Sequence, residues 1–376
     1  MVIKILDFKS LFKSLKFFCW LSFKKIRVDI VFVYLSHFNR AKGRNTYLHH
    51  LIQEAKETNK SYLVFEDSDL AGAYKKQPRS RSAIPFDFIT LVYISLSKLG
   101  LSEQTIFLII KKIFLRNLRF KTIINMAGYT NKLFLSQYQG CEMYEVQHGM
   151  LFNGREWWMS DLWNNYPNCG VLLFGNGYKN MITTQSSIYD PKEDNKARVL
   201  GFENTLSVRP SFTSNIIVLT EQITIDNKDN EIKDYIDHLD LIFSNLNNLN
   251  LKLITKSHPR SPKNKVNILS NLILERTDSI KKYSEIFLHV TFNSSSVFEY
   301  GLCGIPTILL GGLSRRDPTF FVNEYNFPFP NLIINNSRDL EYAISFLKNE
   351  KNYLETSKAI KDWSKEFYSS LQTNML

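Results

Sequence analysis

Residues 286–310 read IFLHVTFNSSSVFEYGLCGIPTILL, and this stretch indicates how the chain folds. An apolar run of strand length ends near Thr291, a turn of asparagine and serines follows, and a helical segment leads through Gly304 and Pro306 into a second apolar run. Continuous apolar strands are typical of parallel sheets that are buried on both faces. The stretch therefore predicts a strand–turn–helix–strand unit of an α/β protein.

The same alternation of strands and helices extends in both directions from this unit. A polar connection that contains Pro210 separates an earlier series of strands and helices from a later one. The chain has 376 residues, which suits two domains of roughly 100–200 residues each. We expect two doubly wound Rossmann-like domains with a helix at each end. The predicted segments are a basic helix at 1–27, a first domain at 28–206, a second domain at 207–350 and a closing helix at 351–376.

The composition is that of a folded protein whose charge is concentrated at one end. Apolar residues make up 44% and charged residues 22%, which excludes a chain that is mainly disordered. Residues 1–27 hold seven basic residues and one acidic residue, interleaved with aromatic ones. Lys13 and Lys16 interrupt any stretch long enough for a signal peptide or a spanning helix. This helix can lie on an anionic membrane surface, or dock on the protein's own core with its lysines in water.

The cysteines indicate a reducing compartment. They lack the short paired spacings of zinc sites and of disulfide frameworks. Together with the missing export signal, this favours a cytoplasmic protein. The four are Cys19, Cys141, Cys169 and Cys303.

The polar turn in the opening stretch is the first candidate site, because ligands of parallel sheets bind beyond the carboxyl ends of strands. Asn293 and the three serines at 294–296 stand at such an end, and Glu299 follows about one helical turn later. The backbone N–H groups of a helix start suit a phosphate, and Glu299 can accept hydrogen bonds from ribose or sugar hydroxyls. The alternative is that the serines only cap the helix.

A second candidate is the sequence KSHPR at 256–260, which follows another predicted strand. Lys256, His258 and Arg260 can neutralise the phosphate of a leaving nucleotide. The alternative is a solvated basic loop.

A third candidate is YEVQHGM at 144–150, at the end of a strand in the first domain. His148 has an ordinary pKa near neutrality and can act as a general base or acid, unless it is simply a turn residue. Downstream, Arg155 and Trp157 belong to a polar and aromatic loop suited to stacking on a sugar. Asp67 and Asp69 form a pair that can hold a divalent metal, although a capping role is the simpler interpretation.

Taken in chain order, EVQHG, KSHPR and SSSVFEYGLCGIP resemble the GT-B glycosyltransferases of bacterial capsule and surface polysaccharide biosynthesis, of the Gln-His-Gly, His-Pro and Ser-Ser motif type. The resemblance spans roughly residues 28–350. It implies two Rossmann-like domains that face a central cleft, with an acceptor domain at 28–206 and a nucleotide-donor domain at 207–350. It also implies transfer without a metal or other cofactor. The polyol-phosphate transferases of teichoic acid synthesis share a comparable motif order, but they have an acidic residue where this chain has Asn293.

The resemblance implies that a sugar passes from a nucleotide-sugar donor to a polysaccharide or lipid-linked glycan at the inner face of the cell membrane, which residues 1–27 would contact. Glu145 or His148 would supply acid–base assistance. The donor would contact Lys256, His258, Arg260, Ser294, Ser295, Ser296 and Glu299, and the acceptor would contact Gln147, Arg155 and Trp157.

Two other functions stay open at this point. One is transfer of a polyol phosphate from a CDP donor, and the other is a non-catalytic nucleotide-sugar-binding protein of an assembly complex. A nucleic-acid-binding function is excluded, because the excess charge lies mainly at one terminus and no nucleic-acid module is recognised.

Overall fold

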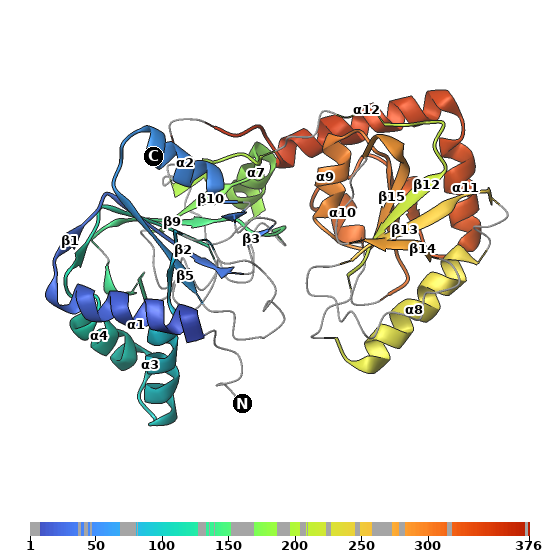
Figure 1. Ribbon diagram of the computed structural model, residues 1–376. Helices are drawn as coiled ribbons and strands as arrows, with labels where there is room; N and C mark the ends of the chain where they lie inside the picture. Colours follow the sequence, from blue (N-terminus) through green and yellow to red (C-terminus); the bar gives the residue numbers. More distant parts are fainter. Residues whose placement is uncertain are drawn as a thin grey trace.

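The computed structural model has two α/β domains, which lie side by side and are joined along one edge by a long C-terminal helix (Figure 1). Apolar runs form the strands of both sheets, as expected for strands covered on both faces. The structure describes residues 8–36, 39–40, 44–45, 47–67, 80, 82–126, 133–134, 136–138, 140–151, 169–185, 196–203, 208, 210–222, 227–244, 249–257, 273–277, 283–313, 318–372 and 375–376.

The first domain is built on a seven-stranded parallel sheet with the order β11-β10-β9-β8-β2-β5-β6. Helices α1, α3 and α4 cover one face, and α2 and α7 cover the other (Figure 1). The strands are β2 (Ile30–Leu35), β5 (Tyr62–Asp67), β6 (Ile84–Pro85), β8 (Thr122–Met126), β9 (Glu142–Val146), β10 (Cys169–Leu173) and β11 (Ala197–Val199). The helices are α1 (Phe8–Phe23), α2 (His49–Glu57), α3 (Asp87–Lys98), α4 (Glu103–Ile113) and α7 (Asn176–Gln185). Two short pairs add β1 (Ile26–Arg27) with β7 (Leu118–Arg119), and β3 (Asn39–Arg40) with β4 (Arg44–Asn45).

The second domain has a six-stranded parallel sheet with the order β14-β13-β12-β15-β16-β17. Numbered within the domain, this is 3-2-1-4-5-6, the Rossmann order, and the first six strands of the first domain follow it too. The α/β class with two Rossmann-like domains is thereby confirmed. The strands are β12 (Ile216–Thr220), β13 (Lys252–Lys256), β14 (Ile273–Thr277), β15 (Ile286–Thr291), β16 (Thr307–Leu310) and β17 (Ile333–Ile334). The helices are α8 (Asp229–Phe243), α9 (Ser296–Leu302), α10 (Thr319–Asn323), α11 (Ser337–Leu347) and α12 (Glu350–Phe367), with 3₁₀ turns at Tyr283–Glu285 and Pro330–Leu332.

Helix α12 connects the two domains. It packs along α9 of the second domain and reaches α7 of the first. The predicted closing helix extends to residue 376, but α12 ends at Phe367, and the chain then runs along the first domain. There, the backbone N–H of Ser369 donates to the carbonyl of Phe174 at 2.9 Å, and that of Gln372 donates to Leu200 at 2.9 Å.

The approach of α12 requires glycine on both domains. A Cβ atom at Gly175 would overlap the backbone carbonyl of Phe367, and one at Gly301 would overlap the Ser364 hydroxyl. Both contacts are shorter than van der Waals distance, so these two glycines let the helix lie close to each domain.

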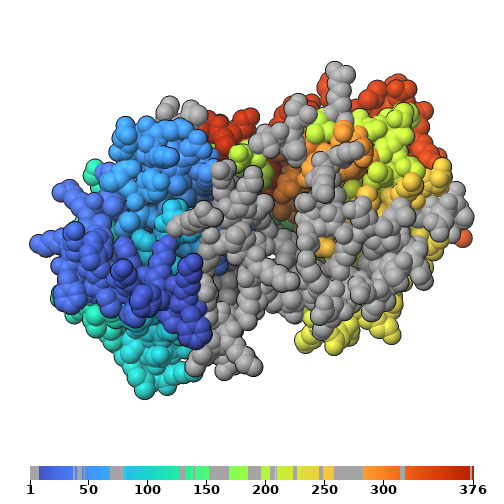
Figure 2. Space-filling model, in the orientation of Figure 1, coloured from blue at the N-terminus to red at the C-terminus, as the bar shows by residue number. Residues whose placement is uncertain are grey.

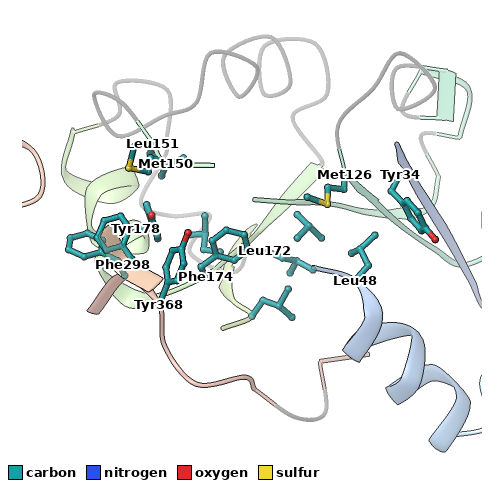
Figure 3. Close-up of a cluster of buried hydrophobic side chains, with 14 of the residues drawn as sticks. Tyr34, Leu48, Met126, Met150, Leu151, Leu172, Phe174, Tyr178, Phe298 and Tyr368 are labelled. Carbon is teal, nitrogen blue, oxygen red and sulfur yellow. The ribbon is translucent and has the colours of Figure 1, made fainter. Parts of the chain in front are cut away.

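An aromatic cluster fills the junction between the domains (Figure 3). Phe298 of α9 is fully buried, and its ring centroid lies 4.9 Å from Trp363 and 5.2 Å from Tyr368. Tyr178 of α7, in the first domain, also belongs to the cluster, with its ring centroid 6.1 Å from that of Phe298. The two domains therefore share one apolar core at this point.

Helix α1 is docked on the first domain and also presents apolar side chains to solvent. Its Phe18 is fully buried, with the ring centroid 5.2 Å from Phe86. On the other side, Phe8, Phe12 and Phe23 are 78%, 69% and 87% exposed. Figure 2 shows this helix at the surface of the first domain. Among the described residues, no helix has the length and apolarity to cross a membrane.

Candidate functional site

The strand order places a candidate site in the second domain. In Rossmann-like sheets, ligands bind between the carboxyl ends of the two central strands, where the order of strands reverses. Here those strands are β12 and β15. The backbone N–H of Asn293, after β15, donates to Oε1 of Gln222, after β12, at 2.9 Å. The predicted serine turn therefore begins at this switch point.

The serine turn has its own internal hydrogen bonds. The backbone N–H of Ser296 donates to Oγ of Ser294 at 3.2 Å, and that of Phe298 donates to the carbonyl of Ser295 at 3.1 Å. Ser294 and Ser295 are partly exposed, whereas Ser296 is 5% exposed and its hydroxyl lies 3.3 Å from Nε2 of His289 beneath the turn. Ser294 and Ser295 are thus the partly exposed serines of the turn, and the side chain of Ser295 also hydrogen-bonds with that of Tyr368.

A lysine stands beside this turn. Lys256, the last residue of β13, places its Nζ 3.6 Å from Oε2 of Glu299, and both side chains are partly exposed. The same Nζ lies 5.5 Å from the ring centroid of Tyr300. A cation and a carboxylate with access to solvent therefore adjoin the serine turn, and the binding of a donor by Lys256 and Glu299 stays a prediction. His258 and Arg260 lie outside the described residues.

In the first domain, Glu145 lies near the carboxyl end of β9 and is 1% exposed. Its register partner on β8 is Asn125, so the two side chains share one face of the sheet. Asn125 is fully buried, and its amide makes no hydrogen bond within the described part of the chain. Asn125 is not among the predicted site residues, although an amide inside the apolar run TIINM is an available signal.

Gln147 has a structural role. It is fully buried, its Oε1 accepts from the backbone N–H of Phe174 at 2.9 Å, and its Nε2 donates to the carbonyl of Gly149 at 2.7 Å. These bonds hold the loop after β9 against the turn that leads into α7. Both ends of the amide are hydrogen-bonded inside the protein, and the contact of Gln147 with an acceptor stays a prediction.

His148 follows Gln147 and is half-buried. Burial lowers the pKa of its imidazole to about 4, so the ring is neutral at pH 7 and able to accept a proton. Arg155 and Trp157, predicted to bind the acceptor, lie outside the described residues.

One hydrogen bond ties the His148 loop to the second domain. The hydroxyl of Tyr325, just beyond α10, donates to the carbonyl of Leu151 at 2.6 Å. The Tyr325 ring lies 5.6 Å from Phe298, two residues beyond the serine turn. The loop after β9 and the start of α9 therefore approach each other across the domain junction.

A metal site finds no support among the described residues, which include no group of three His, Cys, Asp or Glu side chains placed to hold an ion. Asp67 is 1% exposed and accepts a hydrogen bond from the Thr90 hydroxyl at 3.5 Å. Its predicted companion Asp69 lies outside the described residues.

A cavity of about 170 Å³ lies elsewhere, at the amino edge of the first sheet. Asp29, before β2, and Lys121, before β8, line it and form an ion pair of 2.7 Å. The candidate residues are at the opposite, carboxyl ends of the strands, so this cavity is separate from the candidate site.

Two half-buried histidines with lowered pKa values, His148 and His50, predict how stability depends on pH. In the unfolded chain His148 takes up a proton near its ordinary pKa of 6.5, but in the folded protein only near pH 4. Between these values the unfolded state binds more protons, so the free energy of unfolding falls as the pH drops, by about 1.4 kcal/mol per pH unit for one such group. Above pH 6.5 this contribution is constant.

Burial also lowers the pKa of His50 to about 4. We therefore expect His50 to add to the same fall in the free energy of unfolding with decreasing pH. Urea unfolding at pH 7.0, 6.0 and 5.5 measures it, and His148→Asn should flatten the dependence. An unchanged slope in that variant contradicts the prediction.

Comparison with solved structures identifies the fold. The chain resembles a variant of the wall teichoic acid polymerase TagF (TM-score 0.53, 10% identity, 98% of this chain and 95% of that one). It also resembles the UDP-GlcNAc 2-epimerase of Neisseria meningitidis bound to UDP-GlcNAc (TM-score 0.50, 10% identity, 90% and 98%), and the glycotransferase of kitacinnamycin (TM-score 0.51, 10% identity, 91% and 95%). No protein-family model and no curated protein matches the chain. At these identities the likeness shows a GT-B-like fold.

Proposed function

We propose that this protein is a metal-independent glycosyltransferase that moves a sugar from a nucleotide donor to a surface polysaccharide acceptor such as capsule or O-antigen. The observation that carries the proposal is the position of Lys256, Glu299 and the serine turn at the switch point of a Rossmann-like sheet. Structures with the same fold bear the names of a glycotransferase and of an epimerase bound to UDP-GlcNAc, which supports a nucleotide-sugar donor.

On the donor side, Lys256 neutralises a phosphate of the nucleotide, and Ser294 and Ser295 donate hydrogen bonds to it. Glu299 accepts a hydrogen bond from a ribose or sugar hydroxyl, because its partly exposed carboxylate is within reach of the donor. We assign His258 and Arg260 to the same phosphates because they follow Lys256 by two and four residues in the sequence.

On the acceptor side, Glu145 or His148 takes the proton of the attacking hydroxyl. His148 enters the reaction neutral, because burial keeps its pKa low. Arg155 and Trp157 contact the acceptor sugar, and Gln147 supports the loop from beneath through its two buried hydrogen bonds.

The test is a titration of the full chain with CMP, CDP, UDP and GDP, followed by assays of hydrolysis and transfer with the matching nucleotide sugars. Lys256→Met should raise the Kd of the nucleotide that binds by about tenfold or more, because a charge-assisted contact to phosphate is lost. Lys252→Met is the matched control, since Lys252 is the exposed first residue of the same strand. If a folded sample binds none of the nucleotides, the proposal fails.

The alternative of a CDP-polyol phosphotransferase is favoured by one observation, the similarity to the wall teichoic acid polymerase over 98% of this chain. CDP-glycerol in the same panel decides between the two. A phosphodiester product would show the CDP-polyol phosphotransferase, and a glycoside product would show the proposed glycosyltransferase. Binding without turnover of any donor assigns a non-catalytic nucleotide-sugar-binding protein.

We place the protein at the inner face of the membrane because of its exposed apolar side chains. Among the described residues, eight of the eleven large apolar side chains that are well exposed belong to α1, α3 or α4 or flank them. Lysines interleave with them along α1, and Lys111 and Lys112 lie on α4. Arg116 donates to the carbonyl of Ser22, which holds the ends of α1 and α4 together. Aromatic side chains among cations suit an anionic bilayer surface.

Replacing Phe8, Phe12 and Phe23 together by serine should weaken binding to vesicles of phosphatidylglycerol and phosphatidylethanolamine by about tenfold or more, because three exposed rings no longer enter the lipid. Vesicle co-sedimentation measures the effect, and added salt should weaken wild-type binding. The matched control replaces Leu241, Tyr342 and Leu354, which are exposed apolar residues of the second domain. Equal binding by both triple variants contradicts the assignment.

A further inference from the structure

A buried histidine lies beneath the serine turn, outside the set of candidate residues. His289 stands in the middle of β15, a strand whose other described side chains are apolar or hydroxyl-bearing, and it is fully buried. A polar ring in such a place costs free energy unless its nitrogens are hydrogen-bonded. Its partners therefore indicate why it is there.

Both ring nitrogens of His289 have hydroxyl partners. Nε2 lies 3.0 Å from Oγ1 of Thr220 on β12 and 3.3 Å from Oγ of Ser296 on α9. Nδ1 lies 3.1 Å from Oγ1 of Thr307 on β16. One imidazole thus connects three elements that surround the switch point of the sheet.

The ring is held in one orientation and in one protonation state. It stacks on Tyr300 with centroids 3.9 Å apart and planes 9° apart. Burial, and then the nearby charge of Lys256, lower the pKa of His289 well below its ordinary value. A neutral imidazole offers one N–H and one bare nitrogen, which matches hydroxyl groups that can donate or accept.

We propose that His289 is a positioning residue that fixes the turn Ser294–Ser296 over the ends of β12 and β15. The link is Ser296, because its hydroxyl lies against His289 while its backbone N–H bonds to Ser294, the first serine of the turn. The inference rests on the proposed function, in which Ser294 and Ser295 bind the donor. Without the imidazole, the turn keeps its internal hydrogen bonds and the bond from Asn293 to Gln222, but Ser296 loses its contact with β15.

Amide hydrogen exchange of the full chain, without ligand, tests the attachment directly. His289→Phe keeps the ring stack and removes every hydrogen bond of the ring, and Ser296→Ala removes only the link to the turn. Each should speed exchange at residues 293–298 by roughly three- to tenfold, the effect of one net hydrogen bond. The double variant should exchange no faster than His289→Phe, because both changes break the same contact.

Two further variants separate positioning from general stability. His289→Gln, whose amide can reach the Nε2 position, should restore slow exchange at 293–298. Thr255→Val is the matched control and should leave the turn unchanged, because the buried Thr255 hydroxyl makes no hydrogen bond within the described part of the chain. If His289→Phe fails to fold, Ser296→Ala, which keeps the imidazole, carries the test.

Unchanged exchange in Ser296→Ala, or equally faster exchange over the whole sheet, overturns the inference. A second measurement, the Kd of UDP and CDP, distinguishes it from the proposed function. Faster local exchange with weaker binding in Ser296→Ala supports both. Faster local exchange in a protein whose wild type binds neither nucleotide supports the positioning role and counts against the donor assignment.

Discussion

One of two substitutions, His148→Ala or Glu145→Gln, is expected to lower turnover by at least about a hundredfold. The variant with this loss is the one that removes the general base, because general acid–base assistance contributes that much or more. Nucleotide affinity should stay within a factor of about two in both variants, since the donor contacts lie on the second domain. The measurement is kcat and Kd determined on the same samples.

The two substitutions also identify the base. His148 is half-buried and its pKa is about 4, so it is neutral at pH 7 and can accept a proton from an acceptor hydroxyl. Glu145 is 1% exposed and shares its face of the sheet with Asn125, so its carboxylate acts only if the acceptor reaches into this buried pair. Glu142→Gln is the control, because Glu142 is exposed at the other end of β9. Full activity in both site variants would falsify the assignment of the base to this strand end.

The strands were predictable because their signals are local. Runs such as IVFVYL in β2 and IIVLT in β12 are apolar over nearly their whole length, and only a parallel sheet covered on both faces buries such runs completely. The position of Lys256 and the serine turn at strand ends follows from the same pattern. The Rossmann strand order does not, because it depends on which strands pair.

The partners inside the site were not predictable, because they join residues far apart in sequence. In the sequence, Ser296 looks the same as Ser294, and only the fold sets its hydroxyl against His289. Likewise, the sequence does not show that the Gln147 amide bonds to the backbone of Phe174 and of Gly149. His289 itself lies inside the quoted apolar run, where one imidazole gives no hint of its three hydroxyl partners.

The extent of α12 was predicted wrongly for a related reason. The closing helix was predicted at 351–376, whereas α12 ends at Phe367. Beyond it, backbone hydrogen bonds to Phe174 and Leu200 replace those of a further helical turn. Long-range contacts override local helix preference here.

Phe298→Ala should give the largest loss of stability among single substitutions at the domain junction. The ring is fully buried and has aromatic neighbours from three elements, including Trp363 at 4.9 Å and Tyr178 at 6.1 Å. Removing a buried phenyl ring loses its transfer free energy and leaves a cavity, and together these cost about 3–5 kcal/mol. Urea unfolding followed by tryptophan fluorescence and by circular dichroism measures the loss.

The same experiment tests whether the shared core couples the domains. Phe298 contacts both Tyr178 of the first domain and α12, so its loss should separate one unfolding transition into two, with different midpoints by the two probes. Leu354→Ala is the control on α12, where the side chain is 55% exposed, and it should change the free energy of unfolding by no more than about 0.5 kcal/mol. If both variants lose the same small free energy of unfolding, the aromatic cluster does not couple the two domains energetically. The cluster then does not hold the His148 loop near the serine turn.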